Sequence, residues 1–315
     1  MRTTPPVFSA DEIRATLTMS DAIESARTAF RALHAQTVES PPPWHLNVSE
    51  HRGELHVKGA AVHGAPHLSV KVATGFPGNA CHGVPTSDGL TAVVDSATGR
   101  IAALFLDGGY LTELRTGAAG ALALDLLAPA EVEELAIVGS GGQARFQIEA
   151  ALHVRTPERI TVYGRNEDRM RAFATWIQER ADIPVRRAAL DDSPMTATAV
   201  VTVTPSTVPV LYSHQIRAGT HVTAIGSDGP GKRELEPSLL RRADLIVVDS
   251  LHQSQTLGEL QGIDLGGQDV VTLGSLLHRR RTDRDPDLLT IADLSGTGAQ
   301  DAAIAALAAR RLLDN

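Results

Sequence analysis

The chain has 315 residues, a formal net charge of −8 at pH 7 and one cysteine, Cys81. This length favours two domains, each large enough to bury its own core. A single cysteine excludes an internal disulfide framework and a multi-cysteine zinc site. The negative charge and the scattered lysines and arginines argue against a nucleic-acid surface. The basic run Arg279-Arg280-Arg281 is offset by nearby aspartates and indicates a solvated loop.

The sequence also argues against a membrane location. Its apolar runs are all much shorter than a membrane span. Residues 1–6 lack the apolar core of a signal peptide. We therefore expect a cytoplasmic protein with no membrane partner.

The first 40 residues predict two helices. Ser9 is the expected cap of the first helix, and Ser20-Asp21 marks the expected start of the second. Apolar side chains recur at helical spacing along the second helix, which indicates that one face packs on another element.

Residues 54–107 read as strands joined by turns, after the break at Pro41-Pro42-Pro43. The candidate strands are 54–58, 68–74, 90–95 and 101–107, with a hairpin turn at Ala97-Thr98-Gly99. Consecutive strands with short connections predict an antiparallel sheet. A helix rich in alanine and glycine follows over 111–127, with Thr112 as the expected cap.

The second half alternates between strands and helices. Strands are predicted at 135–138, 159–163, 199–203, 221–225 and 244–249, and helices at 142–153, 167–180, 236–242 and 298–313. This alternation predicts a parallel sheet covered on both faces. The expected fold class is α/β, with a Rossmann-type nucleotide domain and an α+β domain that has a mainly antiparallel sheet. Because the last helix is long enough to return to the first domain, the predicted domains are 1–120 with 298–315, and 121–297.

A glycine-rich turn follows the strand at 135–138. It reads Gly139-Ser140-Gly141-Gly142-Gln143-Ala144, a dinucleotide-binding fingerprint between a strand and a helix. Gly139 permits the tight turn, Gly141 lets a pyrophosphate approach the backbone, and Ala144 lets the helix lie close to the strand. The helix start attracts phosphates through its free N–H groups and its dipole. These six residues are the predicted cofactor-binding turn.

The end of the next strand bears on the choice of cofactor. NAD-binding domains usually carry an acidic residue there, but this strand ends in Gly164-Arg165-Asn166. The planar guanidinium of Arg165, with Asn166 beside it, suits a 2′-phosphate. NADP(H) is therefore favoured over NAD(H). The alternative is that Arg165 only caps a loop while Glu167 or Asp168 reaches the ribose.

Three charged residues stand out from their surroundings. Lys71 lies in an otherwise apolar strand, and Arg115 lies near a helix start, in its first turn, where a cation is electrostatically unfavourable without a negative partner. Asp228 directly follows a parallel strand, at the edge where such sheets bind ligands. A solvated lysine and an ordinary turn aspartate are the alternatives. The twelve histidines show no metal-ligand spacing, so no metal is expected.

Together these motifs resemble the ornithine cyclodeaminase/mu-crystallin family. The resemblance rests on pieces that occur in family order: Val70-Lys71-Val72 with Phe76-Pro77-Gly78-Asn79, Asp95-Ser96-Ala97-Thr98-Gly99, residues 111–119, the turn at 139–144, residues 226–235 and Gly296-Thr297-Gly298-Ala299-Gln300-Asp301.

The resemblance implies a homodimer that transfers hydride at the α-carbon of a small amino or imino acid. By position, Lys71 and Arg115 would hold the substrate carboxylate, and Lys71 and Asp228 are the candidate catalytic residues, with Asp228 handling protons. Thr116 and Thr204 would lie near the cofactor. The first domain and the last helix would form the substrate-binding and dimerisation domain.

The sequence departs from the family pattern in one region. Many members carry an arginine just after the prolines, where this chain has Pro43-Trp44-His45. His45 and Lys58 are therefore candidate substrate contacts in its place, with His56 as an alternative to Lys58. This departure puts ornithine itself in doubt as the substrate.

Three functions are compatible with these residues. The leading hypothesis is an NAD(P)H-dependent reductase or dehydrogenase of a small α-imino or α-amino acid. The second is a cyclodeaminase, a lyase in which the cofactor is recycled. The third is a protein that binds a nucleotide without turnover.

Overall fold

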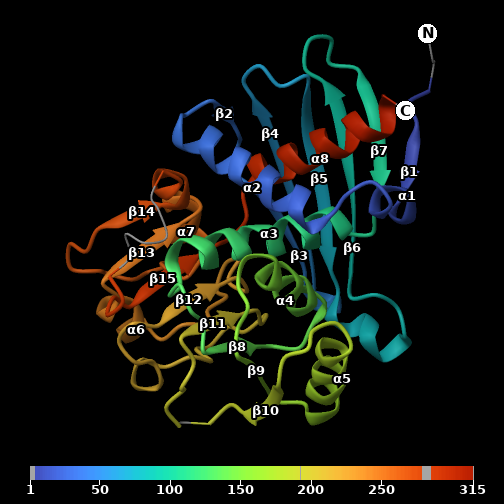
Figure 1. The fold of residues 1–315 in the computed structure, drawn as a ribbon. Coiled ribbons are helices and arrows are strands. Elements are labelled where there is room, and N and C mark those ends of the chain that lie inside the picture. Colours follow the sequence, from blue (N-terminus) through green and yellow to red (C-terminus); the bar gives the residue numbers. More distant parts are fainter. Residues whose placement is uncertain (1–3, 192, 279–284, 315) are drawn as a thin grey trace. The chain divides into compact units, whose positions relative to one another are not determined.

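The computed structural model describes residues 4–191, 193–278 and 285–314 (Figure 1). The chain divides into two compact units, one formed by residues 1–115 with 297–315 and the other by residues 116–296. The basic run Arg279-Arg280-Arg281 lies outside the described residues.

Unit 1 contains the predicted, mainly antiparallel sheet. Its strands follow the order β1-β7-β6-β5-β4-β2, with β3 also paired to β4. The neighbours are antiparallel except for β1, which runs parallel to β7. The four predicted strands are confirmed as β4, β5, β6 and β7, while β1, β2 and β3 were not predicted. The bounds are β1 (Val7–Ser9), β2 (Val38–Glu39), β3 (Trp44–Val48), β4 (Gly53–Val62), β5 (His67–Gly75), β6 (Ser87–Asp95) and β7 (Ile101–Leu106).

The helices of unit 1 are α1 (Ala10–Arg14), α2 (Met19–His34), α8 (Gly298–Leu313) and the start of α3 (Tyr110–Leu127). Ser9 caps α1 with a reciprocal bond to Glu12, as predicted. The predicted start of α2 at Ser20 is wrong, because Thr18 makes the capping box with Asp21. Thr112 likewise lies inside α3, whose Leu111 N–H donates to Asp107 Oδ2 at 2.7 Å.

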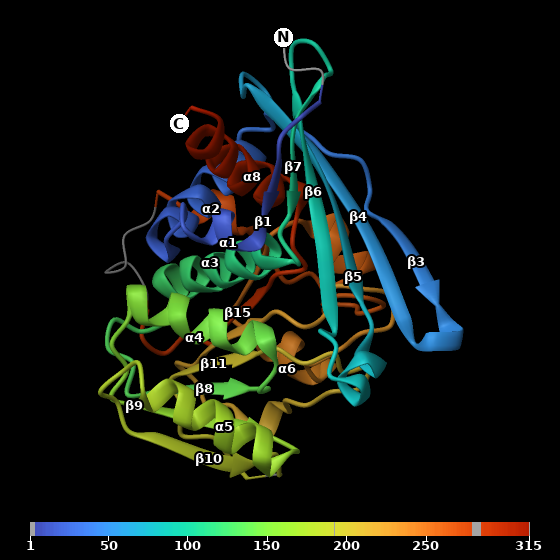
Figure 2. The ribbon, with the colours of Figure 1, turned by 90° about the vertical axis from the view of Figure 1, so that its right-hand side faces the viewer.

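The two faces of this sheet differ. Helix α8 packs against α2 and against β4 and β5 (Figure 2). The face towards α8 carries the core side chains Val93, Ala103 and Phe105. The opposite face is apolar but partly exposed, and Trp44, Leu46 and Val70 keep 56%, 45% and 37% of their surface accessible.

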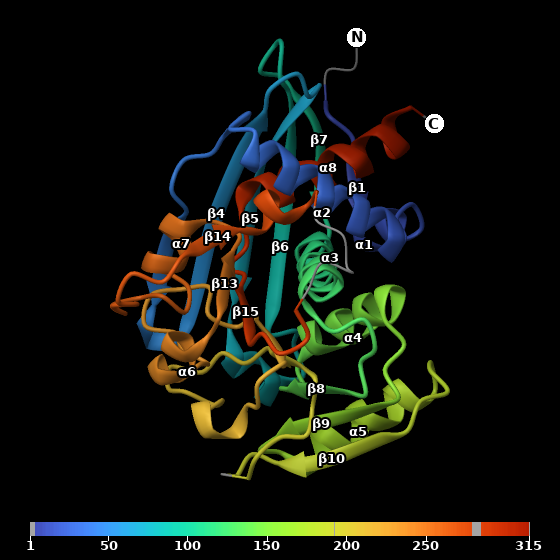
Figure 3. The same cartoon turned by 60° about the vertical axis from the view of Figure 1, so that its left-hand side comes forward.

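Unit 2 contains the predicted parallel sheet (Figure 3). Its strand order is β10-β9-β8-β11-β12-β15-β13-β14, and every neighbouring pair is parallel. The five predicted strands are confirmed as β8, β9, β11, β12 and β13, whereas β10, β14 and β15 were not predicted. The strands are β8 (Glu134–Val138), β9 (Arg159–Gly164), β10 (Val185–Ala189), β11 (Ala199–Thr202), β12 (His221–Ala224), β13 (Leu245–Val248), β14 (Val270–Thr272) and β15 (Thr290–Asp293).

The helices of unit 2, besides the rest of α3, are α4 (Gly142–Val154), α5 (Glu167–Gln178), α6 (Pro237–Arg242) and α7 (Leu251–Thr256). The central strands β8, β11 and β12 are buried along their whole length, as expected for a parallel sheet with two covered faces. In the part of the chain that is described, the helices are all too short or too polar to cross a membrane.

Candidate functional site

A buried cluster of charged side chains lies inside unit 1. Lys71 of β5, Arg115 of α3 and Asp301 of α8 are 4%, 6% and 3% exposed. The Lys71 Nζ atom lies 3.0 Å from Asp301 Oδ1 and 2.9 Å from Oδ2. The Arg115 Nε atom lies 2.9 Å from Asp301 Oδ1. Asp301 therefore holds two predicted site residues side by side.

A third buried cation lies beside this pair. Lys58 is also buried and stands directly opposite Lys71 in the β4–β5 register. Although Arg115 Nε is close to Asp301, the approach lacks hydrogen-bond geometry, and within the described residues this buried donor has no acceptor. Three cations thus surround the Asp301 carboxylate. A buried guanidinium donor without an acceptor is costly, which points to an anionic ligand.

The ionisation of these groups follows from burial and from one another. Burial lowers the pKa of Lys71 to about 7, aided by the charges of Arg115 and Lys58 and opposed by Asp301. Burial alone would raise the pKa of Asp301, but Arg115 and Lys71 outweigh it, so this pKa is lowered. Asp107, at the start of α3, is also buried, and burial raises its pKa. Lys71 is therefore poised to gain or lose a proton near neutral pH.

The sequence explains how these side chains converge. Residues 69, 71 and 93 point to the α8 face because side chains alternate along β5 and β6. Arg115 is the sixth residue of α3 and lies in its second turn, so its predicted place in the first turn is wrong. The helix begins earlier than expected because Asp107, rather than Thr112, satisfies its first N–H groups.

The predicted substrate contact His45 lies elsewhere on this sheet. It stands on β3 opposite His56 of β4, and His56 precedes Lys58 by two residues on the same face. The two Nδ1 atoms are 3.1 Å apart. The sheet face that packs against α8 therefore carries a continuous row of side chains: His45, His56, Lys58 and Lys71.

The glycine turn of unit 2 has the form expected for a phosphate site. Gly139 has a φ of +125°, and a Cβ there would meet the Val203 carbonyl at 2.8 Å. A Cβ on Gly141 or Gly142 would meet no atom within 4 Å, so the space at the start of α4 is open. Ala144 is fully buried. Among the described residues no side chain caps α4 at Gly141, which leaves its first N–H groups facing that space.

The remaining cofactor candidates lie around this turn within unit 2. Arg165 and Asn166 are exposed directly after β9, and Asn166 caps α5 by accepting a hydrogen bond from Arg169 N–H at 2.9 Å. Glu167, an alternative ribose contact, is paired with Arg187. The Gln147 side chain donates to the carbonyl of Thr116 at 3.1 Å and to Gln143 Oε1 at 3.0 Å. Ser140 is half-buried in the turn.

Asp228 and Thr204 follow the ends of neighbouring strands. Asp228 lies in the loop after β12, where its Oδ1 atom is 2.8 Å from Lys232 Nζ. Thr204 follows β11, and its buried hydroxyl has no hydrogen-bond partner in the described part of the chain. The buried carboxylate of Glu234 links the two loops, since it accepts from Thr204 N–H at 2.6 Å and from Gly226 N–H at 2.7 Å.

Two residues of these sites were not predicted. Asp301 occurs in a recognised motif, but an acid in the first turn of a helix is common and carries no signal of its own. Glu234 likewise lies within the motif at 226–235 and carries no signal of its own. Both become visible once the structure shows a fully buried carboxylate among donors.

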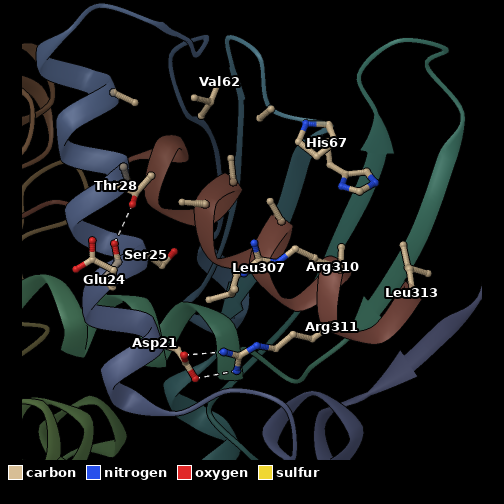
Figure 4. Close-up of a pocket in the computed structure, with 18 of the residues that line it drawn as sticks. Asp21, Glu24, Ser25, Thr28, Val62, His67, Leu307, Arg310, Arg311 and Leu313 are labelled. Atoms are coloured by element: carbon tan, nitrogen blue, oxygen red, sulfur yellow. Dashed lines mark hydrogen bonds and ion pairs between the residues drawn. The ribbon is translucent and has the colours of Figure 1, made fainter. Parts of the chain in front are cut away.

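Unit 1 also contains a pocket of about 710 Å³ between α2, α8 and the segment after β4 (Figure 4). Alanine is the commonest residue in its walls, as at Ala29, Ala302 and Ala306. Arg311 and Asp21 form an ion pair at its edge, with their closest atoms 2.6 Å apart. None of the predicted site residues lines this pocket, and its chemistry does not match the buried cluster.

Comparison with known proteins covers nearly the whole chain. The sequence model of the ornithine cyclodeaminase/mu-crystallin family matches residues 4–315. An uncharacterized cyclodeaminase of Sinorhizobium fredii, y4tK, is 38% identical over 319 residues, covering 98% of this chain and 96% of the relative.

Two solved structures share the fold. An archaeal alanine dehydrogenase dimer with bound NAD has a TM-score of 0.89 at 29% identity, covering 98% of this chain and 96% of that one. The Thermococcus litoralis Δ1-pyrroline-2-carboxylate reductase, in complex with NADH and L-proline, has a TM-score of 0.89 at 26% identity, covering 98% of each chain. The fold and the match along the whole chain show that this protein belongs to the ornithine cyclodeaminase/mu-crystallin family.

Proposed function

We propose that this protein is an NAD(P)H-dependent oxidoreductase that transfers hydride at the α-carbon of a small α-imino or α-amino acid. The observation that carries the proposal is the buried cluster of Lys58, Lys71 and Arg115, in which Arg115 Nε lacks an acceptor. A substrate carboxylate supplies that acceptor. Family membership supports the same class of enzyme.

The turn of unit 2 suits a dinucleotide. Gly139 adopts the conformation the turn needs, and the open space beside Gly141 and Gly142 admits a pyrophosphate to the N–H groups of α4. The same turn residues, with Gln143 and Ala144, and the hydroxyls of Thr116 and Thr204 are the proposed contacts. A bound nicotinamide supplies the hydride, and the protein supplies binding and orientation.

The protein's own residues have distinct proposed roles. Arg115 and Lys71 hold the carboxylate, which fixes the α-carbon in place and so contributes through proximity. Asp228 exchanges a proton with the substrate nitrogen. Its Oδ1 atom lies 2.8 Å from Lys232 Nζ. Lys58 and, further along the same face, His45 are proposed to contact the rest of the substrate.

Cofactor preference is proposed from the end of β9. Arg165 is exposed there, Glu167 is paired with Arg187, and Asp168 Oδ1 lies 3.6 Å from Arg171 Nη1, so both candidate acids have arginine partners. We therefore favour NADP(H), although the two solved relatives bind NAD or NADH. NADPH suits net reduction.

The alternative function is a cyclodeaminase, which the similarity to y4tK supports.

A two-arm assay distinguishes these functions. One arm supplies pyrroline-2-carboxylate and follows the absorbance of NADPH or NADH, and the other supplies ornithine with a trace of oxidised cofactor and measures ammonia. We expect NADPH loss in the first arm and no ammonia in the second. Ammonia without net cofactor change identifies a cyclodeaminase, and cofactor binding without turnover of any offered amino or imino acid contradicts the enzyme proposal.

Arg165→Asp is expected to weaken the binding of NADPH more than the binding of NADH. Equal weakening of the two contradicts the cofactor preference.

We also propose a homodimer. The face of the unit 1 sheet opposite α8 presents exposed apolar side chains, including Trp44, Leu46 and Val70. An exposed apolar face of this kind marks an interaction surface. The archaeal alanine dehydrogenase of the same fold is a dimer, so we take a second copy of this chain as the occupant.

A further inference from the structure

The hairpin formed by β3 and β4 carries a cluster of nitrogen and oxygen donors. His45 stands opposite His56, and Asn47 stands opposite Glu54, in the antiparallel register. One donor atom from each of His45, Glu54 and His56 lies within 4.8 Å of the other two. In the described parts of the chain no other group of three such residues meets this condition. The cluster was invisible to sequence spacing because His45 and His56 meet only through strand pairing.

The hydrogen bonds of the cluster prepare one histidine as a ligand. His45 Nε2–H donates to Asn47 Oδ1 at 2.8 Å. The proton therefore sits on Nε2, and the lone pair of Nδ1 points towards His56, whose Nδ1 lies 3.1 Å away. Metal-binding histidines usually have such an outer partner, which fixes the tautomer and the ring orientation.

The surroundings agree with a metal site. Two imidazoles and one carboxylate are typical ligands of zinc and its neighbours among the divalent transition metals. Tetrahedral zinc places two nitrogen ligands about 3.4 Å apart when each bond is about 2.1 Å, which is close to the separation of the two Nδ1 atoms. Glu54 Oε2 is 3.4 Å from His56 Nε2, the other ring nitrogen, and the three residues together keep one donor atom each within 4.8 Å of the others.

We propose that His45, Glu54 and His56 form a binding site for a divalent transition-metal ion of the zinc type. Three protein ligands leave a fourth position for water or for an external ligand. All three side chains lie on the sheet face that also carries Lys58 and Lys71. The metal site shares no residue with the cluster around Asp301, although His45 is also a proposed substrate contact. Metal binding is measured without turnover, so failure of this proposal and failure of the proposed function are distinguishable.

Metal titration of the full-length, tag-free and chelator-treated protein tests the site. Co²⁺ is followed by visible absorption and Zn²⁺ by calorimetry. We expect one ion per chain, loss of binding in His56→Gln, and an affinity about 10–100-fold weaker in Asn47→Ala, which removes only the outer partner. Circular dichroism without metal confirms that each variant is folded. If His56→Gln does not fold, Asn47→Ala still tests the site.

His63→Gln is the matched control. His63 Nε2 lies 3.1 Å from Glu39 Oε1 in the same unit, and among the described residues this histidine–glutamate pair belongs to no group of three possible metal ligands. We expect this variant to bind Co²⁺ and Zn²⁺ like the wild type. Absence of stoichiometric binding, or equal weakening in His56→Gln and His63→Gln, overturns the proposal and leaves His45 and His56 as a hydrogen-bonded pair only.

Discussion

Asp301 controls how firmly Lys71 keeps its proton. Burial lowers the pKa of Lys71 to about 7, and the Asp301 carboxylate is the main group that opposes this effect. A lysine is charged below its pKa, so Lys71 attracts a carboxylate below about pH 7 and loses this ability as the pH rises through that value. We therefore expect kcat/KM to fall as the pH rises through about 7, because this ratio reports the ionisation of the free enzyme.

Asp301→Asn moves this transition in a defined direction. Without the carboxylate, the charged form of Lys71 loses its main support, so its pKa falls further and the decline in kcat/KM begins at lower pH. Complete pH profiles of wild type and variant measure the shift. Asp95→Asn is the control, since Asp95 is an exposed turn carboxylate of the same unit that bonds Thr98. An unchanged transition in Asp301→Asn would contradict this role.

The single residues of the site were only partly predictable. Lys71 was found because a charged side chain in an apolar strand needs a partner, and Arg115 because a cation near a helix start is unfavourable without one, although Arg115 in fact lies in the second turn. Asp301 was missed because an acid at the start of a helix is favourable without any further function. Asp301 contacts Lys71, which lies 230 residues away along the chain. No local sequence pattern predicts a contact over that separation.

Glu234 joins the ends of two strands, β11 and β12. Its carboxylate accepts from the N–H groups of Thr204 and Gly226 and from the Thr202 hydroxyl at 2.8 Å. Burial nevertheless raises its pKa from 4.5 to about 6. Because the folded state holds the proton more tightly than the unfolded state, Glu234 makes the protein less stable as the pH rises between these two values.

Glu234→Gln removes this pH dependence. The displacement of the pKa corresponds to about 2 kcal/mol in the free energy of unfolding. The wild type loses this stability between about pH 4.5 and 6, and the variant does not. We expect the destabilisation caused by glutamine to be largest near pH 4.5 and to decrease by about 2 kcal/mol by pH 7.5, measured by urea unfolding. Glu236→Gln is the control, because hydrogen bonds from Ser238 and Ser213 lower the pKa of Glu236 and reverse the trend. The same penalty for Glu234→Gln at every pH would contradict the argument.

Helices and long strands were predicted better than short strands. Caps, prolines and apolar periodicity set the ends of α4, α5 and α8 to within about two residues of the expected bounds. The missed strands β14 and β15 have only three and four residues, whereas β11, β12 and β13, with four residues each, were predicted as parts of slightly longer segments. Such segments contain no full alternation, and they become strands only through pairing with neighbours that are distant along the chain.

The order of strands in unit 2 shows the same limit at a larger scale. The parallel sheet was predicted from alternation, yet β15, the last strand, lies between β12 and β13. Its place is fixed by register with both neighbours, such as Ile291 beside Val222 and Ile246. The family resemblance supplied the overall plan, while this arrangement required the structure.

The exposed face of the unit 1 sheet gives the last prediction, which concerns assembly. Val70 lies on β5 with Gly59 and Ala92 as its cross-strand neighbours on the apolar face, and 37% of its surface is accessible in the single chain. A dimer formed through this face buries Val70, so Val70→Asp places an unpaired charge in the interface. Light scattering after size exclusion should give twice 33.3 kDa for the wild type and 33.3 kDa for the variant. Val70→Thr, which keeps the shape and β propensity without a charge, should remain largely dimeric. A wild type of 33.3 kDa at micromolar concentration would exclude a stable dimer, and a dimeric Val70→Asp would place the interface on another surface.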